Sequence, residues 1–412
     1  MMTQARIVIP PDESEPARVA KRGDGERVRE AAVALLRDGP SPTTDGGVPF
    51  RSAQFDAGLA WVDFPLGLGG LGVSPRHQRL VEETLDAAGV PDLRPFNPIA
   101  LSNVAPVLRD HGTLDQQQRF LRPAFAGIDV WCQLMSEPGA GSDVASLATR
   151  AERDGDAWVV NGQKVWTGFA YTASYGLLVA RTNPDLPKHT GITCFIVDMH
   201  AAGVEVRPLR QMTGRAEFNE VFLTDVAVPD AMRVGPVERG WDVISSNLQG
   251  ERLAFVGGDG GGARRSTEVL ARWRNEPATP AFRVRMAALF ERLLALDLTV
   301  ERAAELRARG DASLHPSGLK LLGTEVGVAL AELELERLGV AGSLMPPAYP
   351  DGSPEVEFNH GDTVQERFLR TRANTIEGGT SEVNRNVVAE RQLGLPRERR
   401  DDVGRPWSEV PR

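Results

Sequence analysis

Residues 157–181 read AWVVNGQKVWTGFAYTASYGLLVAR, and this stretch decides the fold class of the middle of the chain. Two short runs rich in apolar and β-branched residues, 157–160 and 163–166, flank the pair Asn161-Gly162. Asn-Gly is the preferred pair in a two-residue hairpin turn. The pattern therefore predicts a hairpin here, followed by another strand over Tyr175–Arg181.

The strand pattern continues beyond this stretch. Further strands are predicted at Gly191–Met199, Val204–Leu209 and Glu220–Val228. Five or more strands without helical periodicity between them indicate an antiparallel sheet or barrel, because parallel βαβ units need a helix in each connection.

Helical patterns precede this block. A first helix fits Glu26–Arg37, Ser74-Pro75 is a good helix start, and another helix covers about 100–110. Thr113 and Gln116 form the capping-box pattern that opens the next helix.

Helical patterns also follow the strands. They cover 241–256 and then about 280–309, 317–339, 362–376 and 381–393. We therefore predict an α+β multidomain protein with an N-terminal α-helical domain, a middle antiparallel β-barrel or β-sheet domain and a C-terminal four-helix bundle. The expected boundaries are a loose arm 1–25, then 26–130, 131–235, 236–397 and a polar tail 398–412.

Composition excludes several classes of protein. The 412 residues carry 47 Lys and Arg against 56 Asp and Glu, a net charge of −9, which disfavours nucleic-acid binding. No apolar run approaches the roughly 20 residues of a membrane span. The two cysteines, Cys132 and Cys194, lack metal-ligand spacing and the six histidines are scattered, so no metal site is expected. We expect a cytoplasmic protein.

Two features of residues 131–167 suggest ligand chemistry. The turn Pro138–Ser142 (PGAGS) can point backbone N–H groups at an anion, and the Ser142 hydroxyl can donate to a phosphate. The indole of Trp166 could stack on a flat ring. Taken alone, the five-residue segment favours an ordinary tight turn, and Trp166 is equally compatible with a core tryptophan.

Together these residues resemble the acyl-CoA dehydrogenase family, over most of residues 50–397. The matching stretches are CQLMSEPGAGSDVASLATRAERDGDAWVVNGQKVWT, AEFNEVFLTDVAVPDAMRVG, NLQGERL and RANTIEGGTSEVNRNVVAERQLGLPRE. The resemblance implies an FAD enzyme that oxidises an acyl-CoA thioester to its trans-2-enoyl form. A carboxylate would remove the α-proton while a β-hydride passes to flavin N5.

The resemblance also implies a set of site residues. Those expected at FAD are Gln133, Met135, Ser136, Gly141, Ser142, Trp166, Thr167, Gly168, Thr380 and Glu382. Those expected at the substrate are Ser142, Arg252 and Gly379. The family usually has Ser or Thr where this chain has Gly168, so Thr167 could substitute near N5.

The family places its base in one of two positions. In one type a Glu directly precedes Gly-Thr near the C-terminus, but here that position is Gly378 and Glu377 is one residue out of register. In the other type the Glu lies on the first helix after the β domain, in a Glu-Arg-Leu context, which Glu251-Arg252-Leu253 matches.

The helix pattern favours the second position. Ile244, Leu248, Glu251 and Phe255 recur at spacings that share one helical face. Apolar neighbours raise the pKa of a carboxylate, which suits a base near neutral pH. We therefore expect Glu251 to be the base, with Arg252 as an active-site cation.

Two segments of the family are missing, and both contact FAD across a subunit interface or at its adenine end. They are Arg-x-x-Phe-Gly and Gln-x-x-Gly-Gly-x-Gly. A homo- or hetero-oligomer is implied, with an electron-transfer flavoprotein as acceptor. The alternatives are a base-bearing or non-catalytic subunit of a heteromeric acyl-CoA dehydrogenase, or a flavin oxidase or monooxygenase of the same fold. The acyl group could be long, branched or ring-bearing.

Overall fold

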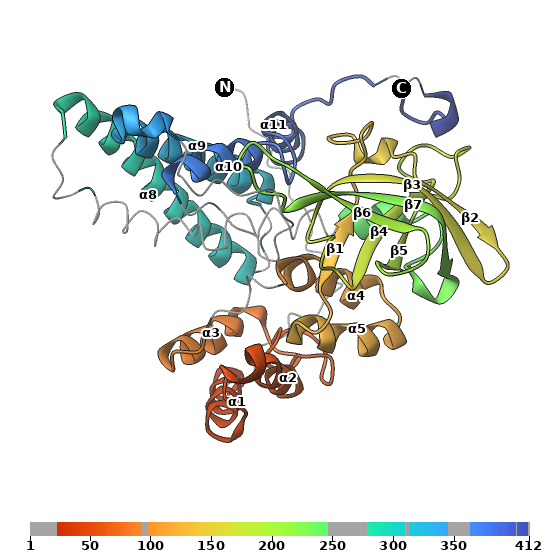
Figure 1. The fold of residues 1–412 in the computed structure, drawn as a ribbon. Coiled ribbons are helices and arrows are strands. Elements are labelled where there is room, and N and C mark those ends of the chain that lie inside the picture. Colours follow the sequence, from red (N-terminus) through yellow and green to blue (C-terminus); the bar gives the residue numbers. More distant parts are fainter. Residues whose placement is uncertain are drawn as a thin grey trace, which may run out of the picture.

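An eight-stranded sheet forms the middle of the molecule, with helices below it and to one side (Figure 1). The computed structural model describes residues 23–91, 97–245, 273, 278–309, 311, 313–344, 363–400 and 402–410. The predicted N-terminal arm lies almost wholly outside these residues. The strands are β1 (Trp131–Leu134), β2 (Arg150–Asp154), β3 (Ala157–Gly168), β4 (Tyr175–Arg181), β5 (Ile192–Asp198), β6 (Val204–Leu209), β7 (Phe218–Pro229) and β8 (Arg233–Val234).

The strand order is β6-β7-β3-β2-β4-β5-β8, with β1 paired to β4. Most neighbours are antiparallel as predicted, but β1 runs parallel to β4, and β2 meets β4 in one parallel pair, Arg150 with Arg181. Strands β4 and β6 begin and end where the sequence predicted. Both faces of β4 are buried: Leu177 and Val179 pack toward the helices, whereas Leu178 and Ala180 pack against the other side of the sheet.

The predicted hairpin at Asn161-Gly162 is wrong. β3 runs through this pair without turning, and the hairpin is instead β2–β3, which turns at Gly155 with a φ of 57°. Asn161 and Gly162 lie at a register shift between β3 and β7. The Asn161 side chain exchanges two 3.0 Å hydrogen bonds with Asp225. A Cβ at Gly162 would lie 2.3 Å from Thr149 Oγ1, so glycine serves close packing here and not a turn.

The N-terminal helices pack beneath the sheet. They are α1 (Asp24–Asp38), α2 (Val48–Asp56), α3 (Gln78–Ala87), α4 (Ala105–His111) and α5 (Leu114–Ala126). The predicted capping box is present, because Gln116 N donates to Thr113 Oγ1 and Thr113 N donates to Gln116 Oε1. Phe120 of α5 makes an edge contact with Trp131 of β1, which joins these helices to the strands.

The C-terminal helices lie at the other side of the sheet (Figure 1). They are α8 (Pro280–Ala308), α9 (Pro316–Arg337), α10 (Val364–Asn374) and α11 (Ser381–Val387). Trp273, Leu289 and Leu330 belong to the apolar cluster between α8 and α9. After α11 the chain crosses back to the sheet. Of the helices described, none is long and apolar enough to cross a membrane.

Candidate functional site

The turn after β1 presents its backbone to the surface. Glu137 and Ala140 close it by exchanging backbone hydrogen bonds of 3.1 and 3.0 Å. Gly139, Gly141 and Ser142 are exposed, and a Cβ at either glycine would meet nothing within 4 Å. An exposed hydroxyl beside glycine amides that a ligand can approach closely is a donor set suited to a phosphate or diphosphate.

Trp166 presents an aromatic face near this turn. Its side chain is 61% exposed although it lies within β3, and its φ is 59°, a left-handed conformation uncommon for a bulky residue. The register shift of β3 against β7 between Lys164 and Thr167 accommodates this backbone. Phe218 supports the indole by an edge contact, with ring centroids 6.3 Å apart. An exposed indole held in a strained conformation can stack on a flat heterocycle.

A buried ion pair joins the turn to β3. Lys164 Nζ lies 2.8 Å from Glu137 Oε1 and donates to the carbonyls of Met135 (3.1 Å) and Val179 (2.8 Å). Glu137 also accepts from the amides of Ala148 (2.6 Å) and Thr149 (2.9 Å). Burial alone would raise the pKa of Glu137, but Lys164 and these amides lower it below its usual range. The carboxylate therefore stays ionised and ties the start of the turn to β3 and to residues 148–149.

Of the predicted residues in and just after β1, the structure brings Ser136 beside the segment that carries Trp166. Ser136 O accepts a 2.9 Å hydrogen bond from Val165 N, the residue before Trp166. Met135 is buried, whereas Gln133 and Ser136 are half-buried. Ser136 therefore joins the segment before the turn to the part of β3 that carries the indole.

Thr167 and Gly168 continue β3. Thr167 is 1% exposed, pairs with Asn219, and accepts a 3.0 Å hydrogen bond from Asn219 Nδ2 at its carbonyl. Within the part of the chain that the structure describes, its hydroxyl has no hydrogen-bond partner. Gly168 pairs with Phe218 and is half-buried. Thr167 thus lies in the interior while Trp166 lies at the surface, so a role for its hydroxyl at flavin N5 stays a prediction.

A second group of predicted residues surrounds the start of α11. Gly379 has a φ of 94°, and its carbonyl accepts from the buried Lys320 Nζ at 2.7 Å. Thr380 is the N-cap of α11, accepting from Val383 N at 3.1 Å. Hydrogen bonds from its own amide and from Thr380 lower the pKa of the exposed Glu382.

Arg370 connects the two groups. This buried α10 residue lies 3.0 Å from Glu217, just before β7, and donates to both oxygens of Glu377 at 3.0 and 3.2 Å. Its guanidinium also lies 5.5 Å from the ring centroid of Phe218, which contacts Trp166. Burial alone would lower the pKa of the Arg370 guanidinium, but the carboxylates of Glu377 and Glu217 raise it above its usual value.

The sequence did not reveal the pairs Lys164–Glu137 and Arg370–Glu217. The signal in the sequence was a Lys or Arg within a stretch of otherwise buried residues. Burying such a charge is costly in free energy unless a carboxylate pairs with it. The predicted base Glu251 and its neighbour Arg252 lie outside the described residues. Glu377, the other candidate, is held in the bidentate pair with Arg370.

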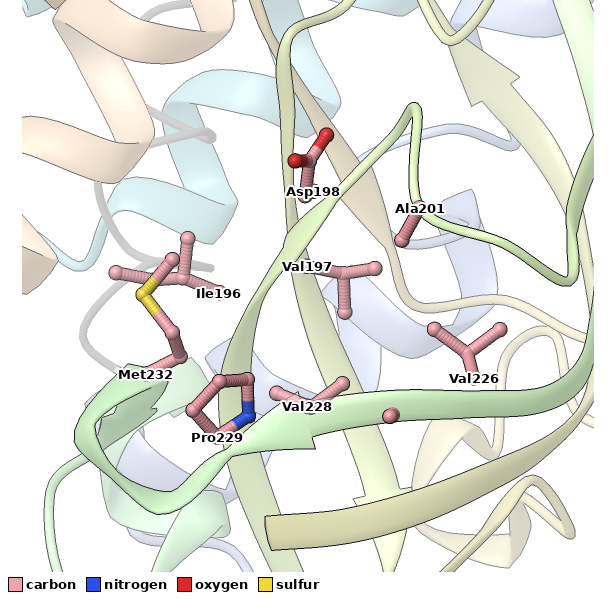
Figure 2. A pocket seen from close by; sticks show the side chains of 9 residues that line it. Ile196, Val197, Asp198, Ala201, Val226, Val228, Pro229 and Met232 are labelled. Carbon is pink, nitrogen blue, oxygen red and sulfur yellow. The ribbon is translucent and has the colours of Figure 1, made fainter.

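A small apolar cavity lies elsewhere on the sheet (Figure 2). Its walls include Ile196, Val226, Val228 and Met232. With a volume of about 40 Å³ it has room for only a few water molecules. In the β3–β7 ladder these β7 residues lie at the end opposite Trp166. The described residues contain no group of three or more His, Cys, Asp or Glu side chains placed to hold a metal ion.

Comparison with protein families places the site in context. Residues 132–226 match the middle domain of acyl-CoA dehydrogenase, and residues 238–393 match its C-terminal domain. The chain is 41% identical over 84% of its length to the acyl-CoA dehydrogenase FadE34 of Mycobacterium tuberculosis. This chain belongs to the acyl-CoA dehydrogenase family. It is accordingly an oxidoreductase of lipid metabolism, and FAD is its cofactor.

The relatives of this acyl-CoA dehydrogenase differ in length. The chain spans 46% of FadE34, but 86% of IpdE1 of Mycobacterium tuberculosis, to which it is 38% identical over 83% of its own length. Solved structures agree on the fold predicted from the sequence. The Tcur3481-Tcur3483 steroid ACAD matches with a TM-score of 0.70 and 29% identity, covering 91% of this chain and 93% of that one. The ChsE4-ChsE5 complex of Mycobacterium tuberculosis matches with a TM-score of 0.68 and 29% identity, covering 92% and 100%.

Proposed function

We propose that this chain carries the base of an acyl-CoA dehydrogenase and converts a bulky, ring-bearing acyl-CoA thioester to its trans-2-enoyl form. Glu251 would take the α-proton, and Arg252 would act as an active-site cation toward the thioester or the base. When bound, FAD would supply the hydride acceptor, its N5 atom, for the hydrogen leaving the β-carbon. The reaction breaks the α- and β-C–H bonds and forms one C=C bond. The acceptor of the two electrons is an electron-transfer flavoprotein.

The described residues fit FAD. The amides of the Pro138–Ser142 turn and the Ser142 hydroxyl would hold its diphosphate, because both are exposed and the two glycines leave room for close approach. Trp166 would cover one face of the isoalloxazine ring. Thr380 and Glu382 would contribute from the start of α11, and Gly379 would contact the substrate there.

The observation that carries the choice of base is the environment of Glu377. Both carboxylate oxygens of Glu377 accept hydrogen bonds from the buried Arg370 guanidinium, so this side chain is committed to an ion pair within the chain. A general base must instead lie within reach of the proton that it removes from the substrate. Glu377 is therefore a counter-ion of Arg370, which leaves Glu251 as the base.

The substrate class rests on the relatives. One similar structure is titled a steroid ACAD. A thioester carrying a fused-ring system is therefore the first substrate to test, with straight-chain acyl-CoAs of several lengths for comparison.

A heteromeric assembly is the second part of the proposal. Both similar structures named above are titled as pairs of different proteins. The chain also lacks the Arg-x-x-Phe-Gly and Gln-x-x-Gly-Gly-x-Gly segments, which complete FAD sites in the family. We infer that a second, homologous chain supplies this half of the FAD site.

The decisive experiment is anaerobic titration of the flavin-loaded protein with each thioester, recorded in the visible flavin bands. We expect a ring-bearing acyl-CoA to bleach the flavin, Glu251→Gln to abolish bleaching at unchanged flavin content, and Glu377→Gln to retain it. Loss of bleaching in Glu377→Gln alone, with Glu251→Gln active, would overturn the assignment of the base. A chain that takes up FAD only when co-expressed with a homologue supports the heteromer, whereas full flavin content in the chain expressed alone contradicts it.

A further inference from the structure

The C-terminal residues 402–410, which we term the clasp, lie against the β domain (Figure 1). Trp407 N donates to Leu186 O at 2.9 Å, and Ser408 N donates to Pro184 O at 3.0 Å. Pro406 forms a β-bridge with Pro187. Backbone pairing therefore fixes the clasp on the connection between β4 and β5.

The Trp407 side chain reaches a loop of the candidate site. Its Nε1 donates to Ser146 O at 3.2 Å, and its ring centroid lies 4.7 Å from the Arg181 guanidinium. Arg181 is 3% exposed and donates to Ala145 O at 2.6 Å. The indole thus covers the cation that holds the loop and also binds the loop directly.

A second contact comes from Asp402. Lys188 Nζ lies 2.6 Å from an oxygen of Asp402 and 2.6 Å from an oxygen of Asp143. One buried ammonium therefore bridges the clasp to the loop. Asp143 also accepts from Ser146 Oγ at 2.6 Å, so the same network fixes both ends of the 143–146 segment.

The held segment follows directly after Gly141-Ser142, the exposed donors of the candidate phosphate site. A Cβ at Gly141 would meet nothing within 4 Å and Ser142 is exposed, so the position of both residues depends on what fixes the chain on either flank. Upstream, the Glu137–Lys164 pair fixes the turn. On the downstream side, the chain after Ser142 is fixed by Arg181, Lys188 and the clasp.

We propose that the clasp orders loop 141–147 and that Trp407 is a positioning residue for the cofactor diphosphate. The role toward FAD rests on the proposed function. The ordering of the loop is independent of the proposed function, because it follows from the contacts between the clasp and loop 141–147.

Hydrogen–deuterium exchange of the full-length chain tests the ordering. In Trp407→Ala we expect the amides of Ser146 and Leu147, which donate to the carbonyls of Asp143 and Val144, to exchange about tenfold faster or more, because the loop loses the contacts of Trp407 with Ser146 and Arg181. Val403→Ala is the matched control, since this clasp residue is 71% exposed. Trp407→Phe keeps a ring over Arg181 and should recover part of the protection.

Flavin binding tests the consequence. We expect the Kd for FAD, measured by flavin fluorescence on the complex of each variant with the co-expressed homologue, to rise about tenfold in Trp407→Ala and to stay unchanged in Val403→Ala. Exchange in Trp407→Ala equal to the control would overturn the proposal, whatever the Kd. Faster exchange with an unchanged Kd would overturn the positioning role. A wild-type chain and its complex that bind no FAD would refute the proposed function, while the exchange experiment would still decide the clasp.

Discussion

A single lysine organises the candidate cofactor surface at the residue scale. Lys164 is fully buried and its three contacts reach the turn after β1, the end of β1 and β4. Removing one member of a buried ion pair leaves the other charge without compensation, which costs more than removing both.

Lys164→Met should therefore lower the free energy of unfolding by about 3–5 kcal/mol, because it strands the buried Glu137 carboxylate. Urea denaturation of the single variants Lys164→Met and Glu137→Gln and of the double variant measures this. We expect the double variant to be more stable than Lys164→Met. Additive losses in the double variant would show that the two side chains do not interact.

The Glu137–Lys164 pair also predicts that the free energy of unfolding falls at acid pH. Because the folded-state pKa of Glu137 is lowered, its contribution to stability is complete above the ordinary Glu pKa of about 4.3 and is lost as the pH falls through the folded value. Urea unfolding at a series of pH values should show wild-type stability falling in this acid range, and a shallower fall in Glu137→Gln. Parallel curves for the two proteins would contradict this assignment.

At the scale of elements, local signals were reliable where local contacts form the structure. The Thr113–Gln116 capping box was predicted because both partners lie within one turn of helix. The prediction at Asn161-Gly162 failed because the partners of this pair are distant in sequence: Asp225 lies in β7 and Thr149 directly precedes β2. A pair that usually makes a turn serves here to pack against those residues.

Gly162→Ala tests this interpretation. The new Cβ would lie 2.3 Å from Thr149 Oγ1 and 2.7 Å from Thr149 Cα, so we expect a loss of about 1–3 kcal/mol in the free energy of unfolding. Gly327→Ala is the control, because a Cβ there meets nothing within 4 Å and alanine favours helix α9 by about 0.5–1 kcal/mol. Equal stability of the two variants would mean that the close approach is unimportant.

The candidate site was predictable to the same extent. Pro138–Ser142 and Trp166 were predicted as site residues from short stretches of consecutive sequence. In the structure the turn reaches the surface and Trp166 is exposed. The strained φ of Trp166 depends on the β3–β7 register, which no local pattern encodes. The ion pairs that position these residues join segments far apart in the sequence, so only the tertiary fold shows them.

At the scale of the whole molecule, buried charges join the β domain to the C-terminal helices. Arg370 of α10 pairs with Glu217, and Glu366 of the same helix lies 3.3 Å from Arg215. Both partners lie in the connection that enters β7, next to Phe218 and therefore close to Trp166. The position of the indole is thus coupled to the helices that carry Gly379 and Thr380.

Arg370→Met should break this coupling. It leaves the buried Glu217 carboxylate uncompensated and releases Glu377, so we expect the free energy of unfolding to fall by about 3–5 kcal/mol. The two domains should also lose cooperativity, so that unfolding followed by tryptophan emission and by far-UV circular dichroism coincides in the wild type and diverges in the variant. Arg372→Met is the matched control on α10, because Arg372 forms a more exposed pair with Glu332 worth about 0–1 kcal/mol. If both variants unfold alike, the helices and the sheet are held together by apolar packing alone, and Arg370 does not transmit the position of α10 to Trp166.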